Sequence, residues 1–136
     1  MSPFVTMQLR SSPKVTAPDG SDVHILPGLT GGGMAHFQLP AGQVTRAVEH
    51  RTVEEIWYVV SGEGELWRRM EGTAEVTSLR AGVAVTIPLG TQFQFRTTGS
   101  EPLQIIAITM PPWPGEGEAM LVNGCWEPTV SESAPC

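Results

Sequence analysis

The chain has few cysteines and no long hydrophobic segment. Its two cysteines, Cys125 and Cys136, show no metal-binding spacing, so we interpret both as free thiols. No apolar run approaches the roughly 20 residues of a membrane span, and no basic segment followed by an apolar one indicates a signal peptide. These absences predict a cytoplasmic protein in which disulfides play no part.

Positive charge is also scarce. The 136 residues include eight Lys and Arg against fourteen Asp and Glu, which gives a formal net charge of −6. Nucleic acids and anionic membranes attract basic surfaces, so we expect neither as a partner. A chain of this length is expected to form a single domain that buries a core without the help of disulfides.

No convincing helical period is present, whereas short apolar runs alternate with glycine turns. β-branched and aromatic residues are frequent in these runs, as is typical of strands. Strands at this spacing, without helices between them, predict an all-β sandwich or barrel. The expected strands cover Val23–Leu26, Met34–Leu39, Ile56–Val60, Glu65–Glu71, Ala74–Leu79, Val83–Ile87, Gln92–Arg96 and Leu103–Thr109.

The two ends of the chain differ in composition from the middle. Residues 1–22 are rich in turn residues and predict a loose arm with one short edge strand, Phe4–Leu9. Residues 23–112 form the predicted barrel. Residues 113–136 form a C-terminal extension containing Pro and Trp, which we expect to wrap the barrel or to reach a neighbouring subunit.

Two glycine-bounded stretches share one design. The first, Gly42–Gly62, contains His50 and Glu55 ahead of an aromatic, β-branched run. The second, Gly82–Thr97, has a strand on each side of a Pro88–Gly90 turn. These stretches resemble the paired motifs of the cupin superfamily, and the resemblance covers about residues 30–112. It implies a single-domain jelly-roll barrel, in agreement with the strand pattern.

The resemblance also implies an incomplete metal site. The two histidine places of the first motif fall on Val48 and His50, and its glutamate falls on Glu55. In the second motif the histidine place falls on Phe93 and the asparagine place on Thr97. All the glycines and the proline fit, whereas Val48 and Phe93 stand where two metal ligands are expected.

Side-chain alternation along a strand gives direction to these residues. It places Val48 and His50 on one face, and it places Glu55 on the same face as Trp57. In a cupin both faces point into the barrel, so His50 and Glu55 would approach the point where cupins hold a divalent metal. Imidazole nitrogen and carboxylate oxygen suit Fe, Mn, Ni, Cu or Zn.

A catalytic metal usually has three or more protein ligands, so further ligands are needed. Gln92 lies one residue before the vacant histidine place, and a small bulge after the preceding turn would direct it inward. His36 lies on the neighbouring predicted strand and is the other candidate. The alternative is a structural role, in which His50 and Glu55 hydrogen-bond each other or an aromatic partner.

Aromatic residues accompany the motifs. Trp57, Phe93 and Phe95 are expected to form the core or to line an apolar pocket for a small molecule. Arg46 is a candidate for meeting an anionic substrate at the rim, with a plain surface arginine as the alternative.

Two functions remain open. The first is a metalloenzyme of the dioxygenase, isomerase or decarboxylase type, in which the metal acts as a Lewis acid or activates oxygen. The second is a non-catalytic, metal-free cupin that binds a small apolar or sugar-like ligand. The resemblance also implies a homodimer, for which the N-terminal arm and the region of Trp113 and Trp126 offer apolar surface.

Overall fold

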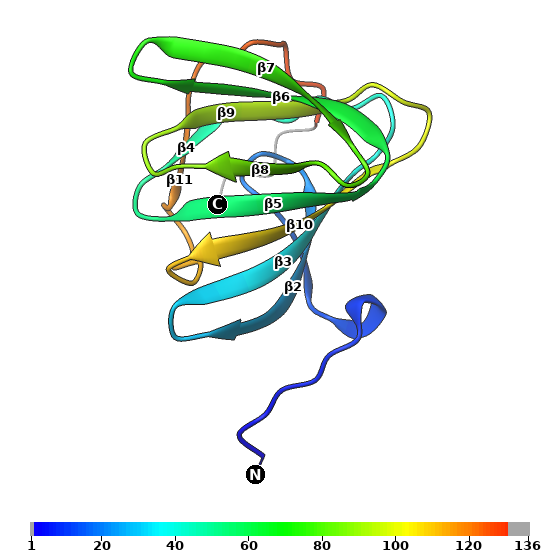
Figure 1. Ribbon diagram of the computed structural model, residues 1–136, viewed down its shortest axis with the longest axis vertical. Helices are drawn as coiled ribbons and strands as arrows, with labels where there is room; N and C mark the ends of the chain where they lie inside the picture. Colours follow the sequence, from blue (N-terminus) through cyan, green and yellow to red (C-terminus); the bar gives the residue numbers. More distant parts are fainter. Residues whose placement is uncertain (1, 131–136) are drawn as a thin grey trace.

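Two antiparallel β-sheets pack face to face in the computed structural model, which describes residues 2–130 (Figure 1). The larger sheet has the strand order β1-β2-β3-β10-β5-β8, and the smaller has the order β11-β4-β9-β6-β7. Within the described residues there is no helix long and apolar enough to cross a membrane. The predicted all-β jelly-roll architecture is therefore confirmed, while Cys136 lies outside the described part of the chain.

The strands follow one another along the chain with short turns between most of them. Their bounds are β1 Lys14–Thr16, β2 Asp22–Leu29, β3 Gly32–Leu39, β4 Val48–His50, β5 Glu54–Ser61, β6 Glu63–Met70, β7 Thr73–Arg80, β8 Ala84–Ile87, β9 Gln92–Thr97, β10 Leu103–Met110 and β11 Ala119–Leu121.

Both motifs cross from one sheet to the other. In the first motif, β4 belongs to the smaller sheet and β5 to the larger, so the chain changes sheet between His50 and Glu54. In the second motif, the turn at Pro88–Gly90 carries the chain from β8 back to β9. These crossings bring the end of β4 close to the start of β5, which is where the candidate site lies.

The space between the sheets is filled by alternate residues of the strands. On β5 every second residue is buried, and β10, which belongs to the same sheet, has the same pattern. Burying a large apolar side chain contributes about 1.5–3 kcal/mol, so this core stabilises the fold strongly. The fully buried apolar side chains include Leu39, Val48, Trp57, Val59, Leu66, Leu79, Phe95, Leu103 and Ile105.

The last glycine of the first motif has a steric reason to be glycine. Gly62 joins β5 to β6 with a φ of +87°, a conformation that side chains rarely allow. A Cβ atom at this position would lie 2.3 Å from the carbonyl oxygen of Pro102. The turn therefore requires both the backbone freedom and the small size of glycine.

The ends of the chain differ from the sequence-based expectation. The predicted edge strand Phe4–Leu9 is wrong, because these residues are exposed and lead into a 3-10 turn at Leu9–Ser11. The edge strand is instead β1, which pairs with β2. The C-terminal extension contributes a further strand, β11, which pairs with β4 and was not predicted.

Candidate functional site

His50 and Glu55 come together at the end of the barrel where β4 passes into β5. The Nδ1 atom of His50 lies 3.8 Å from Oε2 of Glu55. Both side chains are buried, with exposed fractions of 7% for His50 and 2% for Glu55. Alternation along the strands correctly predicts that both point between the sheets, because Val48 and Trp57 on the same faces are buried as well.

Aromatic rings enclose the pair. The His50 ring packs edge-on against Phe93, with 5.1 Å between the ring centroids, and against Trp113 at 4.9 Å. Trp57 packs against Phe93 at 5.6 Å and against Phe95 at 5.2 Å. The aromatic residues predicted as core or pocket wall thus lie around the pair, and Trp113 from the extension joins them.

Glu55 has a hydrogen-bond donor, whereas the facing histidine nitrogen lacks one. The indole Nε1 of Trp57 donates to Oε1 of Glu55 at 2.7 Å. Among the described residues, Nδ1 of His50 finds no hydrogen-bond partner, although it is buried. Buried polar atoms are almost always paired in native proteins, so this nitrogen indicates a position that a ligand could occupy.

Burial favours the uncharged form of both side chains. Desolvation lowers the pKa of His50 from 6.5 to about 4, although the negative charge of Glu118 opposes this shift. Desolvation raises the pKa of Glu55 from 4.5 to about 7, although the hydrogen bond from Trp57 opposes it. With a separation of 3.8 Å and neutral forms favoured on both sides, the contact is not an ion pair at neutral pH.

Glu118 was not identified from the sequence, yet it holds the loop that carries the site. Its carboxylate accepts hydrogen bonds from the backbone N–H groups of Thr52 and Val53 at 2.7 and 3.0 Å, and from the Thr52 hydroxyl. Burial would raise the pKa of Glu118, but these hydrogen bonds outweigh it and the pKa lies below its ordinary value. No motif in the sequence points to this residue.

Comparison with known proteins agrees with this geometry. The family model for the cupin domain matches residues 35–109, which is more than half of the chain. The chain belongs to the cupin family. An uncharacterized protein of Methanocaldococcus jannaschii is 30% identical over 88 residues, which cover 65% of this cupin and 67% of the relative.

Solved structures show the same fold at low sequence identity. The formate complex of Lactobacillus farciminis oxalate decarboxylase has a TM-score of 0.71 at 18% identity, covering 83% of this cupin and 34% of that chain. Bacillus subtilis oxalate decarboxylase, studied for its Mn(II) centres, has a TM-score of 0.65 at 20% identity, covering 74% of this cupin and 28% of that chain. This cupin thus spans about a third of the oxalate decarboxylase chains.

A variant of Streptomyces PAC13 solved with uridine is similar over nearly its whole length. Its TM-score is 0.70 at 13% identity, and the match covers 88% of this cupin and 92% of that chain. Identities at this level show a shared fold and leave the chemistry to the residues of the site.

Two of the predicted metal ligands do not join the site of this cupin. His36 lies on the opposite face of β3 from the core, where Nε2 hydrogen-bonds Oε1 of Gln104 at 3.0 Å. Gln92 pairs with Glu49 on the outer face of the smaller sheet, and its amide donates to Glu49 at 3.4 Å. Regular alternation explains both placements, because no bulge turns Gln92 inward.

Arg46 also lies away from the pair. Its guanidinium donates to the carbonyl of Pro18 at 3.2 Å, and it lines a pocket of about 440 Å³ with residues 121–128. That pocket includes neither His50 nor Glu55. The structure therefore gives Arg46 a place beside the C-terminal extension rather than at the rim of the site.

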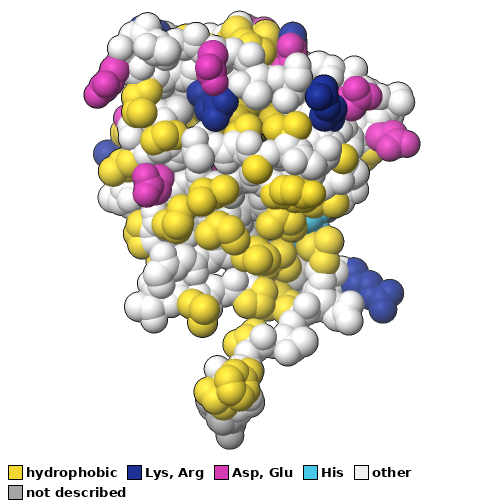
Figure 2. Space-filling model, in the orientation of Figure 1, with side chains coloured by type: hydrophobic (Ala, Val, Ile, Leu, Met, Phe, Trp, Pro, Cys, Tyr) yellow, Lys and Arg dark blue, Asp and Glu magenta, His cyan; other side chains and the backbone are white. Residues whose placement is uncertain are grey.

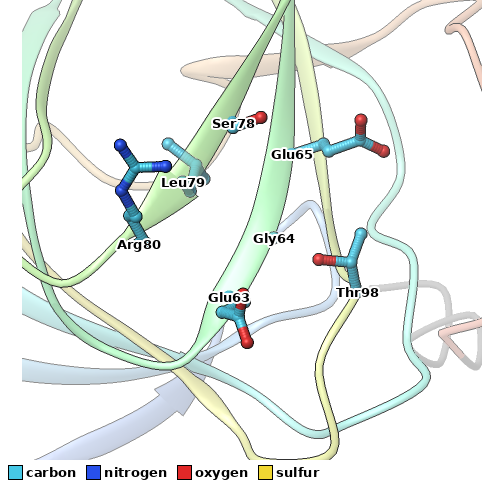
Figure 3. Close-up of a pocket in the computed structure, with 7 residues that line it drawn as sticks. All are labelled: Glu63, Gly64, Glu65, Ser78, Leu79, Arg80 and Thr98. Atoms are coloured by element: carbon cyan, nitrogen blue, oxygen red, sulfur yellow. The ribbon is translucent and has the colours of Figure 1, made fainter.

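A second pocket lies on the β6–β7 hairpin. It has a volume of about 300 Å³ and is lined by Glu63, Gly64, Glu65, Ser78, Leu79 and Arg80 of the hairpin together with Thr98 (Figure 3). Glu65 at this pocket is already engaged by Arg96, whose guanidinium donates to it at 2.6 Å. Aromatic rings are missing from its lining, so it lacks the composition of the site around His50.

The donor set does not fit a resident catalytic metal. In the described part of the chain, no three His, Cys, Asp or Glu side chains come together as a metal site. His50 and Glu55 supply two donors, and the remaining motif positions hold the buried apolar side chains of Val48 and Phe93. Catalytic metals usually have at least three protein ligands.

Proposed function

We propose that this cupin binds a small, uncharged polar molecule at the His50–Glu55 pair and catalyses the transfer of a proton to or from it. In this proposal the side chains of the site do not hold a metal ion. The observation that carries this proposal is the buried Nδ1 of His50, which faces Glu55 and has no partner in the described residues. An apolar, aromatic enclosure with a few convergent polar atoms is the usual composition of a small-molecule site.

The charge state of the pair supports proton transfer. Near neutral pH His50 is uncharged and can accept a hydrogen bond, while Glu55, with its pKa raised to about 7 by burial, can give or take a proton. A group whose pKa lies near the working pH is well matched to general acid–base catalysis. An uncharged ligand is expected because the surroundings of the pair disfavour charge.

Trp113 defines the entrance to the proposed site. Its ring packs against His50 and is 38% exposed, so it lies between the pair and solvent. A ligand that reaches Nδ1 of His50 would first move the Trp113 ring aside and would then pack against the ring in its new position. The extension is therefore proposed to form part of the binding site, in addition to its contacts with the barrel.

The metalloenzyme hypothesis is less well supported by the residues. A bound metal would be held by His50 and Glu55 and would act as a Lewis acid. Two donors are fewer than such a centre requires, and the carboxylate is already engaged by Trp57. The donor set therefore favours a site without metal, as in the second hypothesis from the sequence, and the proposal departs from that hypothesis by adding proton transfer at Glu55.

Metal analysis and ligand binding test the proposal together. We expect the purified protein to hold far less than one equivalent of Fe, Mn, Ni, Cu or Zn. Ligand-observed NMR against aromatic and sugar-like compounds should identify a binder whose affinity falls at least about tenfold in His50→Ala. Gln92→Ala is the matched control, because Gln92 lies on the outer face of the barrel and should leave binding unchanged.

Proton transfer needs a separate measurement. In D₂O the bound compound should gain deuterium with the native protein, whereas Glu55→Gln should bind it and exchange at least about a hundredfold more slowly. One equivalent of metal that disappears in His50→Ala would overturn the metal-free proposal. Binding that is equally strong in His50→Ala and Gln92→Ala would place the ligand elsewhere.

A further inference from the structure

Two of the three histidines of the chain lie side by side on the outer face of the larger sheet. His24 on β2 is the cross-strand partner of His36 on β3. Directly opposite residues of antiparallel strands carry their side chains on the same face, with Cβ atoms about 4.5–5.5 Å apart. That face is the outer one, because the neighbouring Phe37 packs against the core. The two histidines are therefore separate from the His50–Glu55 pair inside the barrel.

His36 is buried although it lies on the outer face, with an exposed fraction of 3%. Little histidine surface is visible in Figure 2. The Nε2 atom of His36 lies 3.0 Å from Oε1 of Gln104, an oxygen that only accepts hydrogen bonds. Nε2 therefore carries the ring proton, and the lone pair of the neutral ring is on Nδ1. In the described residues this buried Nδ1 has no hydrogen-bond partner, which points to a ligand at this position.

The hydrogen bonds of His24 lead to a matching result. Its Nδ1 atom lies 3.0 Å from the hydroxyl oxygen of Ser12. That hydroxyl has one proton, which it donates to the carbonyl of Leu9 at 2.5 Å. Toward His24 the hydroxyl oxygen accepts, so Nδ1 of His24 carries the ring proton and the lone pair is on Nε2.

Each ring thus has one nitrogen fixed by a polar neighbour and a second nitrogen with a lone pair to give. Metal-binding histidines have this arrangement, because a hydrogen bond to the other ring nitrogen fixes the tautomer and orients the ring. We propose that His24 and His36 together bind a divalent transition-metal ion that prefers imidazole nitrogen, such as Ni²⁺, Cu²⁺ or Zn²⁺. Ser12 and Gln104 orient the two rings.

The spacing of the rings fits a shared ion. The ring centroids of His24 and His36 lie 6.1 Å apart, with an angle of 66° between the ring planes. An ion about 2.1 Å from a ring nitrogen lies roughly 3.2 Å from the ring centroid, so a shared ion requires centroids about 5–6.5 Å apart. The half-buried ring of His24 can turn to meet the ion while the buried ring of His36 stays in place.

Charge near the two rings favours a cation. Asp22 lies two residues before His24 and so shares its face of β2, and the whole chain carries a formal net charge of −6. Lys14 is the cross-strand partner of His24 on β1, and its Nζ lies 3.9 Å from Oδ2 of Asp22. Both of these charged side chains are more than a third exposed, so water screens the positive charge of Lys14.

Two protein ligands bind an ion more loosely than the three or four of a catalytic or structural centre, and water would complete the coordination. We therefore expect the ion to exchange freely, to be removed by dialysis against a chelator and to return when it is added. The proposal is independent of the proton transfer proposed at His50 and Glu55. A protein that is purified without metal is compatible with both.

Isothermal titration calorimetry with NiCl₂ on dialysed, tag-free protein tests the site. We expect one equivalent of Ni²⁺ to bind in the micromolar range, whereas Mg²⁺, which prefers oxygen ligands, should not bind. His24→Gln and His36→Gln should each weaken Ni²⁺ binding at least about tenfold. His50→Gln is the matched control, because it removes the third histidine and should leave the affinity for Ni²⁺ unchanged.

Ser12→Ala tests the orienting hydrogen bond and should weaken Ni²⁺ binding about tenfold, whereas Ser12→Thr keeps the hydroxyl and should retain the native affinity. Circular dichroism checks the fold of each variant, and His24→Gln, at a half-buried position, decides the outcome if His36→Gln does not fold. A native protein that binds no Ni²⁺ would overturn the proposal. It would also be overturned if His24→Gln bound Ni²⁺ as tightly as the native protein, or if only His50→Gln lost the ion.

Discussion

At the scale of single residues, Nδ1 of His50 and Oε2 of Glu55 lie 3.8 Å apart, yet the two side chains do not form an ion pair at neutral pH. Burial shifts the pKa of each toward the neutral form, in opposite directions along the pH scale. Their protonation should therefore affect stability with opposite signs. The pair can be studied by removing one member at a time.

The first prediction concerns the pH dependence of stability. Glu55 keeps its proton up to a higher pH in the native state than in the unfolded state. Its contribution to the free energy of unfolding therefore falls as pH rises from 4.5 to about 7. His50 takes its proton more readily when unfolded, so its contribution rises between about pH 4 and 6.5. We expect the free energy of unfolding to rise more steeply with pH in Glu55→Gln than in the native protein, and to fall more steeply with pH in His50→Gln. Each difference should amount to on the order of 3 kcal/mol across the pH window of the group removed.

Urea unfolding at half-unit pH steps measures these differences. Contributions from other groups, such as the buried Asp19, cancel because they are common to all three proteins. Parallel profiles for the native protein and both variants would show that neither group has a shifted pKa.

The second prediction concerns the hydrogen bond from Trp57 to Glu55. Trp57→Phe removes the indole donor, which stabilises the charged carboxylate more than the neutral acid. The pKa of Glu55 should rise further, and the loss of stability should be larger at pH 8 than at pH 5, by about 1–2 kcal/mol. Unfolding by urea at the two pH values measures the difference, and an equal loss at both would contradict the prediction.

The residues of the pair could be predicted from the sequence because the motif fixes their spacing and alternation fixes their direction. The two further ligands predicted from the sequence, His36 and Gln92, do not join the pair, because they lie near the motif in sequence but on the outer faces of their strands. Trp113 and Glu118 come from the extension, and their approach to the pair depends on how that segment returns to the barrel.

At the scale of elements, one buried amide helps to attach the C-terminal extension to the barrel. The Nε2 of Gln94 donates to the carbonyls of Thr45 and Trp126, and its Oε1 accepts from the backbone N–H groups of Cys125 and Trp126. All four distances lie between 2.7 and 2.9 Å. Together with the pairing of β11 with β4, these bonds hold the extension against the barrel.

The third prediction concerns this attachment. Gln94→Met keeps the side-chain volume and removes the four hydrogen bonds, so the extension should detach locally. Hydrogen exchange at the amides of Cys125 and Trp126 should accelerate at least about tenfold, since their acceptor is lost. Gln92→Met is the control on the same strand, because the side chain of Gln92 donates to Glu49 at 3.4 Å and does not contact the extension in the described residues. Equal exchange in both variants would contradict the prediction.

The elements divide by how well the sequence indicated them. Strands β2, β3 and β5 to β10 follow apolar runs bounded by glycine turns, and their extents differ from the prediction by a few residues, whereas β4 has no counterpart among the expected strands. β1 and β11 each have three residues and exist because an edge is available to pair with. Such strands have little local signal, and tertiary context decides their position.

At the scale of the whole molecule, the sequence was sufficient for the fold, because the spacing of turns and the two motifs indicate the same jelly roll. The use of the surface could not be predicted. The apolar residues Ile56 and Tyr58 alternate with the buried Trp57, and only the register with β10 shows that they share a patch with Ile106 and Ile108. A second copy of the chain that covered this patch would add to the stability of the fold.

The last prediction concerns the homodimer that the family resemblance implies. If unfolding is coupled to dissociation, the melting temperature should rise with concentration, because mass action favours the folded dimer. A hundredfold increase in chain concentration is worth about 2.7 kcal/mol per dimer, which corresponds to a shift of a few degrees. Ile56→Glu should melt at a temperature independent of concentration. Val76→Glu is the control, because Val76 is about as exposed as Ile56 but lies in the smaller sheet, and it should retain the native dependence. A native melting temperature that is constant over this range would show that the folded chain gains no stability from association.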